Sequence, residues 1–352
     1  MTGPLKNRLT KLIQRGPVMS AIITASGVAK TFRQSKRLPG LGGALRSLFS
    51  REYTEIHAVS DVSFAIEPGE AVGYLGPNGA GKSTMIKMLT GILVPSAGTL
   101  SVLGRQPHSH RMVNAAEIGV VFGQRSQLWW DLPVRDSLDL NRHIYDIPQA
   151  RFADNLAYLT SMLDMGLYLN RPVRQLSLGQ RMRAEIALAL LHDPKVLFLD
   201  EPTIGLDVVA KDAVRKFLAE VNRERGTTII LTTHDLVDIE EICPRLIMVD
   251  DGKLLFDGAL KHLRATLGSR RRLTLEFTAD PGPIMLATAT LVADKGTAKH
   301  FILEDETVSL LDVLGEVGRG HGLKDIKLEE PAIEEVIRTF YQTKPRLAEA
   351  AP

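Results

Sequence analysis

The sequence predicts an α/β fold with a second, smaller α+β domain, and three observations support this fold class. First, a glycine-rich run at residues 76–84 lies between an apolar, strand-like segment at 71–75 and a helix-compatible segment at 85–90. Second, strand-like and helix-like segments alternate from residue 196 to residue 243. Third, the pattern of the chain changes after Leu260. Alternation of this kind is typical of a parallel sheet covered by helices.

Length and composition place the chain among globular proteins. With 352 residues, of which 44% are hydrophobic and 24% charged, it is long enough for two domains and too apolar to be disordered. No apolar run approaches the roughly 18 residues of a membrane span, and the basic start lacks the apolar core of a signal peptide. The single cysteine, Cys243, excludes an internal disulfide and favours a small buried apolar role in a reducing cytosol.

Positive charge gathers at the start of the chain. Residues 1–51 hold ten lysines and arginines and no acidic residue, although the net charge of the whole chain is only +2. This asymmetry predicts contact with an anionic surface such as lipid headgroups, and a solvated tail is the alternative for residues 1–18. We expect residues 1–21 to form a basic extension. Met19 is a second candidate start, because the first strand pattern begins at Ile22.

Two predicted strands, at residues 22–30 and 56–66, come before the glycine-rich run. Residues 34–52 lie between them as an insertion that contains several glycines and a short amphipathic stretch. The basic charge of this insertion and the apolar positions Leu45, Leu48 and Phe49 predict contact with a membrane surface or with a partner protein.

Later elements follow the same logic. Short strands are expected at 100–103 and 119–122, and residues 134–192 have mostly helical periodicity. A further series of strands and helices is expected at 196–199, 212–224, 227–231 and 236–243. The turn residues 250–253 separate two short strands and predict a hairpin.

Beyond residue 260 the sequence predicts a small α+β domain over residues 261–343. Its expected elements are strands at 273–277, 301–303 and 326–328, a helix-compatible segment at 284–293, a further element at 308–317 and a closing helix at 332–341. We expect residues 344–352 to form a frayed tail.

The glycine-rich run reads Gly-Pro-Asn-Gly-Ala-Gly-Lys-Ser-Thr and fits the phosphate-binding loop at all of its fixed positions. The glycines allow backbone N–H groups to turn toward an anion, and the following helix adds its positive end. In such a loop the lysine reaches the terminal phosphates and the first hydroxyl ligates Mg²⁺. The predicted nucleotide contacts are Gly76, Pro77, Asn78, Gly79, Ala80, Gly81, Lys82, Ser83 and Thr84.

Two acidic residues end an apolar, strand-like run at residues 196–201. Such a strand can place Asp200 near Mg²⁺ and Glu201 near an attacking water. Gln124 and His234 each follow another predicted strand, where an amide can contact Mg²⁺ or water and an imidazole can contact a γ-phosphate. Taken alone, both of these residues could equally be structural.

A second candidate anion site lies at residues 176–180, Leu-Ser-Leu-Gly-Gln, before a predicted helix that Pro194 stops. Ser177 stands at the N-cap position, and the Ser-x-Gly start offers free N–H groups at the positive end of the helix dipole. An ordinary capped helix is the alternative.

Taken in order, these motifs strongly resemble those of the ATP-binding cassette (ABC) ATPases over about residues 22–260. The resemblance implies a P-loop NTPase cassette with a RecA-like core, an antiparallel β subdomain and an α-helical subdomain at about residues 125–180. It also implies ATP and Mg²⁺ as cofactors. Leu178 departs from the pattern because it replaces the middle glycine of the signature, and we expect Ser177 and Gly179 to keep their phosphate contact.

The resemblance implies a role for each matching residue. Residues 76–84 would be the Walker A loop, Gln124 the Q-loop glutamine, Ser177, Gly179 and Gln180 the signature contacts, Asp200 the Walker B carboxylate, Glu201 the general base, Asp207 a contact in the D-loop at 204–207, and His234 the switch histidine. The implied Mg²⁺ ligands are Ser83, Gln124 and Asp200, and the catalytic residues are Glu201, His234 and Lys82.

The aromatic residue that stacks on adenine has two candidates. Counting forward from the first strand selects Phe32, and counting back from the uninterrupted segment at residues 61–64 selects Tyr53. We favour Tyr53, because the backward count does not cross the insertion.

The resemblance further implies a head-to-tail pair of ATPase subunits, formed with a second copy or with a related chain. Ser177 and Gly179 of one subunit would meet the phosphate held by Lys82 of the other. Separate transmembrane permease subunits would receive the motion. Trp129 and Trp130, the only tryptophans, would lie in the region that receives a permease helix, where an interface anchor and a core position suit them equally.

Residues 327–336 resemble the ending of export-type ATPases whose permease is a separate chain, such as drug and polysaccharide exporters. We therefore expect a peripheral ATPase on the cytoplasmic face of the inner membrane that drives export. The alternatives are an importer ATPase, a non-transport ABC ATPase acting on ribosomes or DNA, and a general GTPase or kinase. The single phosphate loop and the lack of zinc-binding cysteines argue against nucleic acid as a partner.

Overall fold

The computed structural model describes residues 21–35, 53–123, 125–266, 271–303, 308–317, 322–329 and 333–348. These residues belong to two compact units that divide between Ala259 and Leu260, and each unit is described by itself. Within this described part, none of the helices combines the length and the apolar character needed to span a bilayer. Residues 1–20 of the predicted extension, residues 36–52 of the insertion, and Gln124 lie outside the described residues.

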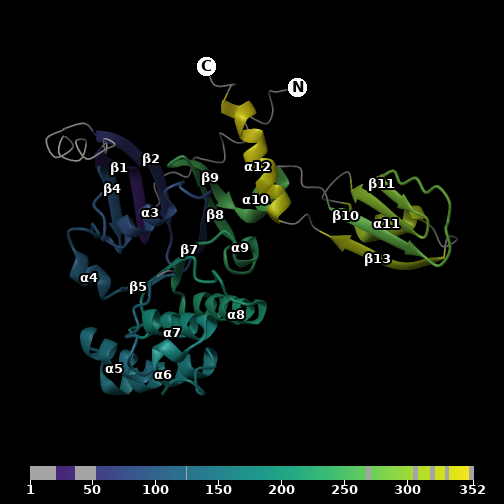
Figure 1. Ribbon diagram of the computed structural model, residues 1–352. Coiled ribbons are helices and arrows are strands. Elements are labelled where there is room, and N and C mark those ends of the chain that lie inside the picture. Colours follow the sequence, from purple (N-terminus) through teal and green to yellow (C-terminus); the bar gives the residue numbers. More distant parts are fainter. Residues whose placement is uncertain are drawn as a thin grey trace, which may run out of the picture. The chain divides into compact units, whose positions relative to one another are not determined.

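The centre of the first unit is a six-stranded sheet with the order β5-β6-β7-β3-β8-β9 (Figure 1). Its strands are β3 (Ala71–Leu75), β5 (Ile118–Phe122), β6 (Val196–Asp200), β7 (Thr228–Thr232), β8 (Arg245–Asp250) and β9 (Lys253–Ala259). All neighbours pair in parallel except β8 and β9, which form an antiparallel hairpin. The turn of this hairpin holds Asp251 and Gly252 at positive φ, as the predicted hairpin requires. The parallel strands are apolar because both of their faces are covered.

A three-stranded antiparallel sheet packs on the core with the order β2-β1-β4. Its strands are β1 (Ile23–Ser35), β2 (Tyr53–Ile66) and β4 (Ala97–Val102). The β1–β2 hairpin is longer than the predicted strands, since its register continues through Phe32 opposite Ile56 to Ser35 opposite Tyr53. Buried apolar side chains of this sheet, of helix α3 (Lys82–Leu89) and of the central sheet form one cluster.

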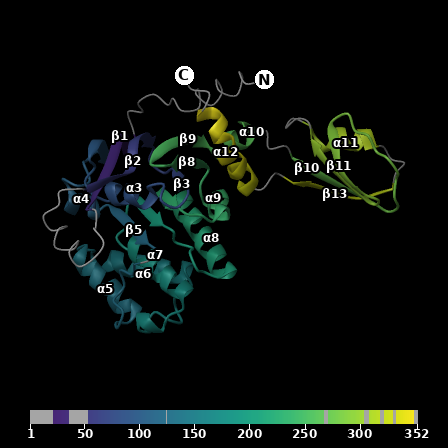
Figure 2. The same cartoon turned by 45° about the horizontal axis from the view of Figure 1, so that its top comes forward.

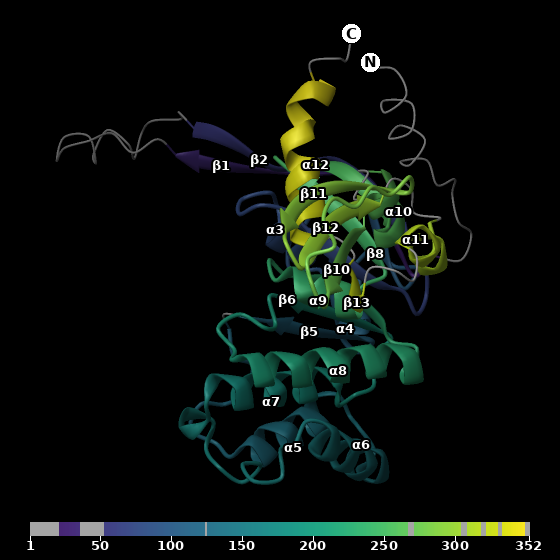
Figure 3. The same ribbon diagram turned by 90° about the vertical axis from the view of Figure 1, so that its right-hand side faces the viewer.

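Helices connect the parallel strands and also form a separate group. Helix α8 (Val208–Arg225) joins β6 to β7, helix α9 (Leu236–Ile242) joins β7 to β8, and the short α4 (Arg111–Ala115) precedes β5. The helical region consists of α5 (Val134–Ile144), α6 (Gln149–Met162), the 3₁₀ turn η1 (Val173–Gln175) and α7 (Leu178–Leu190). Figures 1, 2 and 3 all show this region at the end of the first unit opposite to β1 and β2. The predicted α/β cassette, with its antiparallel and helical subdomains, is thereby confirmed.

The second unit contains a four-stranded antiparallel sheet with the order β11-β12-β10-β13. Its elements are α10 (Leu260–Thr266), β10 (Arg272–Phe277), β11 (Ala289–Lys295), β12 (Ala298–Leu303), α11 (Leu310–Val317), β13 (Leu323–Glu329) and α12 (Ile333–Ala348). Buried apolar residues of the sheet and of α11, among them Leu275, Phe301 and Val313, form a core of their own.

Two predictions for the second unit are wrong. The helix-compatible segment at 284–293 contains no helix, because Ala289–Lys295 pairs with β12 as an edge strand and Gly296, at φ 69°, makes the turn between them. Strand pairing therefore overrode local helix propensity. The closing helix α12 also extends to Ala348, so the predicted frayed tail begins at least five residues too early.

Candidate functional site

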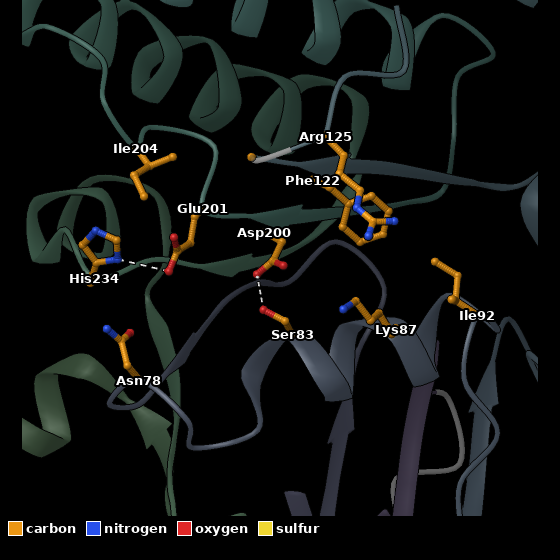
Figure 4. Close-up of a pocket in the computed structure, with 11 residues that line it drawn as sticks. Asn78, Ser83, Lys87, Ile92, Phe122, Arg125, Asp200, Glu201, Ile204 and His234 are labelled. Atoms are coloured by element: carbon orange, nitrogen blue, oxygen red, sulfur yellow. Dashed lines mark hydrogen bonds and ion pairs between the residues drawn. The ribbon is translucent and has the colours of Figure 1, made fainter. Parts of the chain in front are cut away.

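A cavity of about 570 Å³ opens in the first unit at the carboxyl edge of the parallel strands (Figure 4). Its wall comes from the loop after β3, the start of α3 and the residues that follow β5, β6 and β7. Binding crevices of open α/β sheets occur at this edge. The lining residues are Asn78, Ser83, Lys87, Ile92, Phe122, Gly123, Arg125, Asp200, Glu201, Ile204 and His234.

The loop between β3 and α3 has the backbone geometry of an anion site. Gly81 precedes the helix at φ 94°, and a Cβ there would lie 2.1 Å from the carbonyl oxygen of Ala58, so only glycine fits. Gly79 is also left-handed, at φ 87°, and faces open space. The helix that begins at Lys82 directs its free N–H groups toward this loop.

Lys82 is buried beside the loop, and its Nζ donates hydrogen bonds to the carbonyl oxygens of Gly76 (2.7 Å) and Pro77 (3.1 Å). Burial lowers the pKa of the Lys82 ammonium, while the negative charges of Glu201 and Asp200 act in the opposite direction. These two charges belong to the predicted general base, Glu201, and to the predicted Mg²⁺ ligand, Asp200. A polyphosphate in the cavity would add anionic charge close to the Lys82 ammonium.

Asp200 ends β6 and is held by its neighbour strand. Its Oδ1 accepts a hydrogen bond from Thr232 Oγ1 on β7 at 2.5 Å and one from Ser83 Oγ at 3.3 Å (Figure 4). Asp200 and Thr232 are direct partners in the β6–β7 register, so the sheet itself aims the carboxylate at the start of α3.

The next residue, Glu201, leaves the strand in a left-handed conformation, at φ 56°. A Cβ on the adjacent Gly123 would lie 2.5 Å from the carbonyl oxygen of Glu201, so these two backbones approach too closely for any side chain at position 123. Oε1 of Glu201 lies 3.1 Å from Nδ1 of His234, and Figure 4 shows the two side chains facing each other. A strained conformation of this kind is often found at catalytic positions.

The residues present fit Mg²⁺ and a nucleotide. Ser83 and Asp200 together offer a hydroxyl and a carboxylate oxygen, which are the ligand types that Mg²⁺ takes alongside nucleotide phosphates. Across the residues with described positions, no group of three or more His, Cys, Asp or Glu could hold a metal ion by itself. Mg²⁺ in this cavity would complete its coordination with oxygens of the nucleotide phosphates and of water.

The structure brings together part of the predicted site. Asn78, Ser83, Asp200, Glu201 and His234 line one cavity. The lining residues Lys87, Ile92, Phe122, Gly123 and Arg125 were not predicted from the sequence. Two signals were available, since Lys87 follows Ser83 by one helical turn and Arg125 follows the predicted glutamine directly.

The signature residues do not line this cavity and instead shape a helix start. The Ser177 hydroxyl accepts a hydrogen bond from Gln180 N at 3.2 Å, and Gln180 Oε1 accepts one from Ser177 N at 3.0 Å, which makes a capping box on α7. Asp207 caps α8 in a similar way, because its Oδ1 accepts from Ala210 N at 2.8 Å. Tyr53 also lies outside the lining residues.

Leu178, the departure from the signature pattern, packs on the segment that follows Glu201. A Cβ built on Gly205 would lie 2.9 Å from Leu178 Cδ2. On the next residue, a Cβ built on Gly179 would lie 3.1 Å from Ala210 Cβ. The leucine therefore connects the start of α7 with the loop before α8 in the same chain.

A buried carboxylate holds the loops around the cavity. Asp238, on α9, has no exposed surface and accepts hydrogen bonds from Thr203 Oγ1 (2.5 Å), Thr233 Oγ1 (2.9 Å) and Arg215 Nε (2.6 Å). Thr203 follows Glu201 by two residues, and Thr233 directly precedes His234. One carboxylate thus fixes both segments that carry the Glu201–His234 pair.

Comparison with known proteins agrees with this geometry. The family model described as "ABC transporter" matches residues 59–204. The chain belongs to the ABC transporter ATP-binding family, whose members bind and hydrolyse ATP.

The relatives include proteins that are named for import and proteins that are named for export. The methionine import ATP-binding protein MetN 2 of Bacillus licheniformis is 32% identical over 297 residues, which are 83% of this chain and 82% of the relative. The Nod factor export ATP-binding protein I of Paraburkholderia xenovorans is 36% identical over 216 residues, which are 61% of this chain and 70% of the relative.

A solved structure of the same fold is the dimeric, post-hydrolysis state of the ATP-binding cassette MJ0796, bound to ADP and Pi. It matches with a TM-score of 0.57 and 24% identity, over 68% of this chain and 98% of that one.

We predict that Asp238→Ala lowers the free energy of unfolding by about 3 to 5 kcal/mol, because it leaves the buried Arg215 guanidinium without its closest partner. Urea unfolding of the full chain measures this change. Lys216→Ala is the control, since its ion pair with Asp212 is solvent-exposed and its loss should change the stability far less than the loss of Asp238. Equal effects of the two variants would contradict the role assigned to Asp238.

Proposed function

We propose that the chain is the ATP-hydrolysing subunit of a transporter and works at the cytoplasmic face of a membrane with separate transmembrane subunits. One observation carries the proposal: the phosphate loop, the Ser83–Asp200 pair and the Glu201–His234 pair meet in a single cavity. Phosphoryl transfer needs these parts, since catalysis depends on positioning and on charge neutralisation.

In this proposal Glu201 is the general base and His234 orients it. The loop N–H groups and Lys82 bind the β- and γ-phosphates, and Ser83, Gln124 and Asp200 hold Mg²⁺, which would neutralise charge on the phosphate oxygens. Glu201 then accepts a proton from the attacking water. The 3.1 Å contact between His234 and Glu201 supports a shared role, because an imidazole N–H donated to the carboxylate keeps it aimed.

Two such subunits would complete each ATP site. Ser177, Gly179 and Gln180 are not among the residues that line the cavity of their own chain, and we infer that they act on the γ-phosphate held by a second subunit. The helix that Ser177 caps offers a positive end to that phosphate. The dimeric form of the MJ0796 cassette, which has the same fold, is consistent with this arrangement.

The register of β1 with β2 bears on which aromatic residue stacks on adenine. Ala58 of β2 touches the phosphate loop at Gly81, and Phe32 pairs with Ile56, two residues away. Tyr53, which the sequence favoured, is five residues from Ala58, or roughly 16 Å along the strand. We therefore propose Phe32 as the stacking residue and retain Tyr53 as the alternative.

The permease contact would lie on the helical region. Trp129, Trp130 and Leu132 are 56%, 52% and 38% exposed, so these tryptophans are surface residues and not part of a core. We call these three side chains the Trp surface. Exposed adjacent tryptophans suit an anchor for a partner helix.

Export is the proposed direction, on the resemblance of residues 327–336 to export-type ATPases. Import is the second candidate, because the match to the importer MetN 2 is longer than the first unit and so includes part of the second. Metabolite content of cells carrying Glu201→Gln distinguishes them: a blocked exporter raises the transported compound inside the cell, and a blocked importer depletes it.

We predict that Glu201→Gln keeps ATP binding but lowers turnover by about 100- to 10,000-fold, because the general base is lost. Steady-state phosphate release and isothermal titration with ATP measure the two properties. In the presence of ATP the variant should also accumulate as a dimer in size-exclusion chromatography. Turnover near the wild-type rate would remove the general-base assignment.

We predict that Phe32→Ala weakens ATP binding by about tenfold, the loss expected for one base–aromatic stack, and that Tyr53→Ala changes it by less than about twofold. Fluorescence titration with a labelled ATP analogue measures both affinities. The reverse order of effects would restore Tyr53 as the stacking residue.

We predict that the double variant Trp129→Ala/Trp130→Ala, made in the Glu201→Gln protein, no longer retains a membrane protein in a pull-down from detergent-solubilised source membranes with ATP. ATP binding should persist, since neither tryptophan lines the cavity. A control with Met112→Ala, another highly exposed apolar residue, should retain the partner. Recovery of ribosomal proteins or nucleic acid by the parent protein would instead refute the transport function.

A further inference from the structure

Glu185 is a buried carboxylate in the helix that carries the signature residues. It lies on α7 and is only 4% exposed. Among the described residues, no lysine, arginine or histidine forms an ion pair with it within 4 Å. Burial raises the pKa of this carboxyl group, and hydrogen bonds from residues 126–128 together with the positive charge of Arg181 act in the opposite direction. An unpaired buried carboxylate is costly, so its partners need a physical explanation.

In the described part of the chain, all of its hydrogen-bond partners belong to one segment that is remote in sequence. The carboxylate accepts hydrogen bonds from Ser126 Oγ, from Gln127 N (3.0 Å to Oε1 and 3.1 Å to Oε2) and from Leu128 N (3.4 Å). Two of these donors are backbone N–H groups of a segment that lies outside any helix or strand. The Glu185 carboxylate therefore accepts the hydrogen bonds that a neighbouring strand would accept in a sheet.

This segment connects two features of the proposed function. It follows Arg125, which lines the nucleotide cavity, and it precedes Trp129 and Trp130. The Trp surface is held at its far side as well, because Arg174 N donates to Trp130 O at 3.0 Å and Arg174 Nη1 donates to Asp131 Oδ1 at 2.9 Å. Arg174 is three residues before Ser177, so both attachments lead to α7.

The helix between these attachments is well suited to carry a displacement. Glu185 follows Ser177 by eight residues, or roughly 12 Å along the axis. The capping box fixes the first turn of α7, and the buried residues of its later turns pack it into the unit. A displacement of Ser177 would therefore move residue 185 by a similar amount, because α7 between them would bend little.

We propose that Glu185 is a positioning residue that fixes residues 126–128 to α7, so that occupancy of the nucleotide site is transmitted to the Trp surface. This inference rests on the proposed function, because it assigns the path by which ATP binding reaches the permease contact. Glu185 itself touches neither the cavity nor the exposed tryptophans.

The two tryptophans supply a direct measurement, since the chain has no others. The parent is the full-length Glu201→Gln protein, in which ATP binds without turnover. Tryptophan emission is recorded during titration with MgATP, and ATP affinity is measured separately by calorimetry. We expect a saturable emission change in the parent.

Adding Glu185→Leu removes every acceptor and keeps the helix. The ATP-induced emission change should fall by about fivefold or more, whereas ATP affinity should change by less than about twofold. Glu185→Gln keeps one acceptor oxygen and should restore part of the change. Asn155→Ala is the matched control, because Asn155 Nδ2 donates to Leu191 O at 2.9 Å and ties α7 to α6 without touching residues 126–132. It should behave as the parent.

Each outcome decides a separate question. A parent that does not bind ATP refutes the proposed function. A parent that binds ATP with no emission change, a Glu185→Leu protein that responds fully, or a control that also loses the response overturns the role of Glu185. If Glu185→Leu does not fold, hydrogen exchange in the parent replaces it. Peptides covering residues 126–132 and the start of α7 must then respond to ATP together, and a response of α7 alone overturns the inference.

Discussion

The nucleotide cavity depends on the parallel pairing of β6 with β7. This register sets Asp200 opposite Thr232 and brings the residues after each strand to one edge of the sheet, beside the loop that leaves β3. A slip of one residue would turn Asp200 to the opposite face and separate it from Ser83. Close packing of the side chains that precede Asp200 and Thr232 opposes this slip, because each would have to enter a buried site shaped by a different residue. The packed interior of the sheet therefore holds Asp200 beside Ser83.

Two buried carboxylates position the loops that follow the strands. Each of them connects segments that lie outside the strands of the sheet. Asp238 ties the loops after β6 and β7 to helix α8. Glu185 ties the segment after β5 to helix α7. Loops at a functional edge have no ladder of their own, so their donors need acceptors from neighbouring helices. The loops after β5, β6 and β7 are thus fixed by two buried carboxylates, whereas helix α3 and the strand ends supply the rest of the cavity wall.

Much of the site could be predicted from the sequence because its parts are local. The phosphate loop, the acidic end of β6 and the capped start of α7 each occupy fewer than ten consecutive residues, and their order specified the family. The carboxylates Asp238 and Glu185 gave no local signal, because their partners lie up to 59 residues away. The same limit explains β11, whose strand state depends on pairing with β12 and not on its own helix-compatible composition.

The choice between Phe32 and Tyr53 shows what sequence counting omits. Both counts were consistent with the sequence, since an insertion separates the two residues. The structure adds a reference point, because Ala58 of β2 contacts the phosphate loop at Gly81. The strand register then gives the number of residues between Ala58 and each candidate.

The left-handed backbone of Glu201 has a consequence for how this position is maintained. Any side chain with a Cβ is strained by about 1 to 2 kcal/mol in that conformation, and glycine would avoid this strain. Glycine would also raise the conformational entropy of the unfolded chain, which opposes the gain. The contact of Glu201 Oε1 with His234 Nδ1 at 3.1 Å is one interaction that glycine could not make in return. The residue type that suits this backbone therefore differs from the one that the proposed general-base role requires, so position 201 exchanges some stability for chemistry.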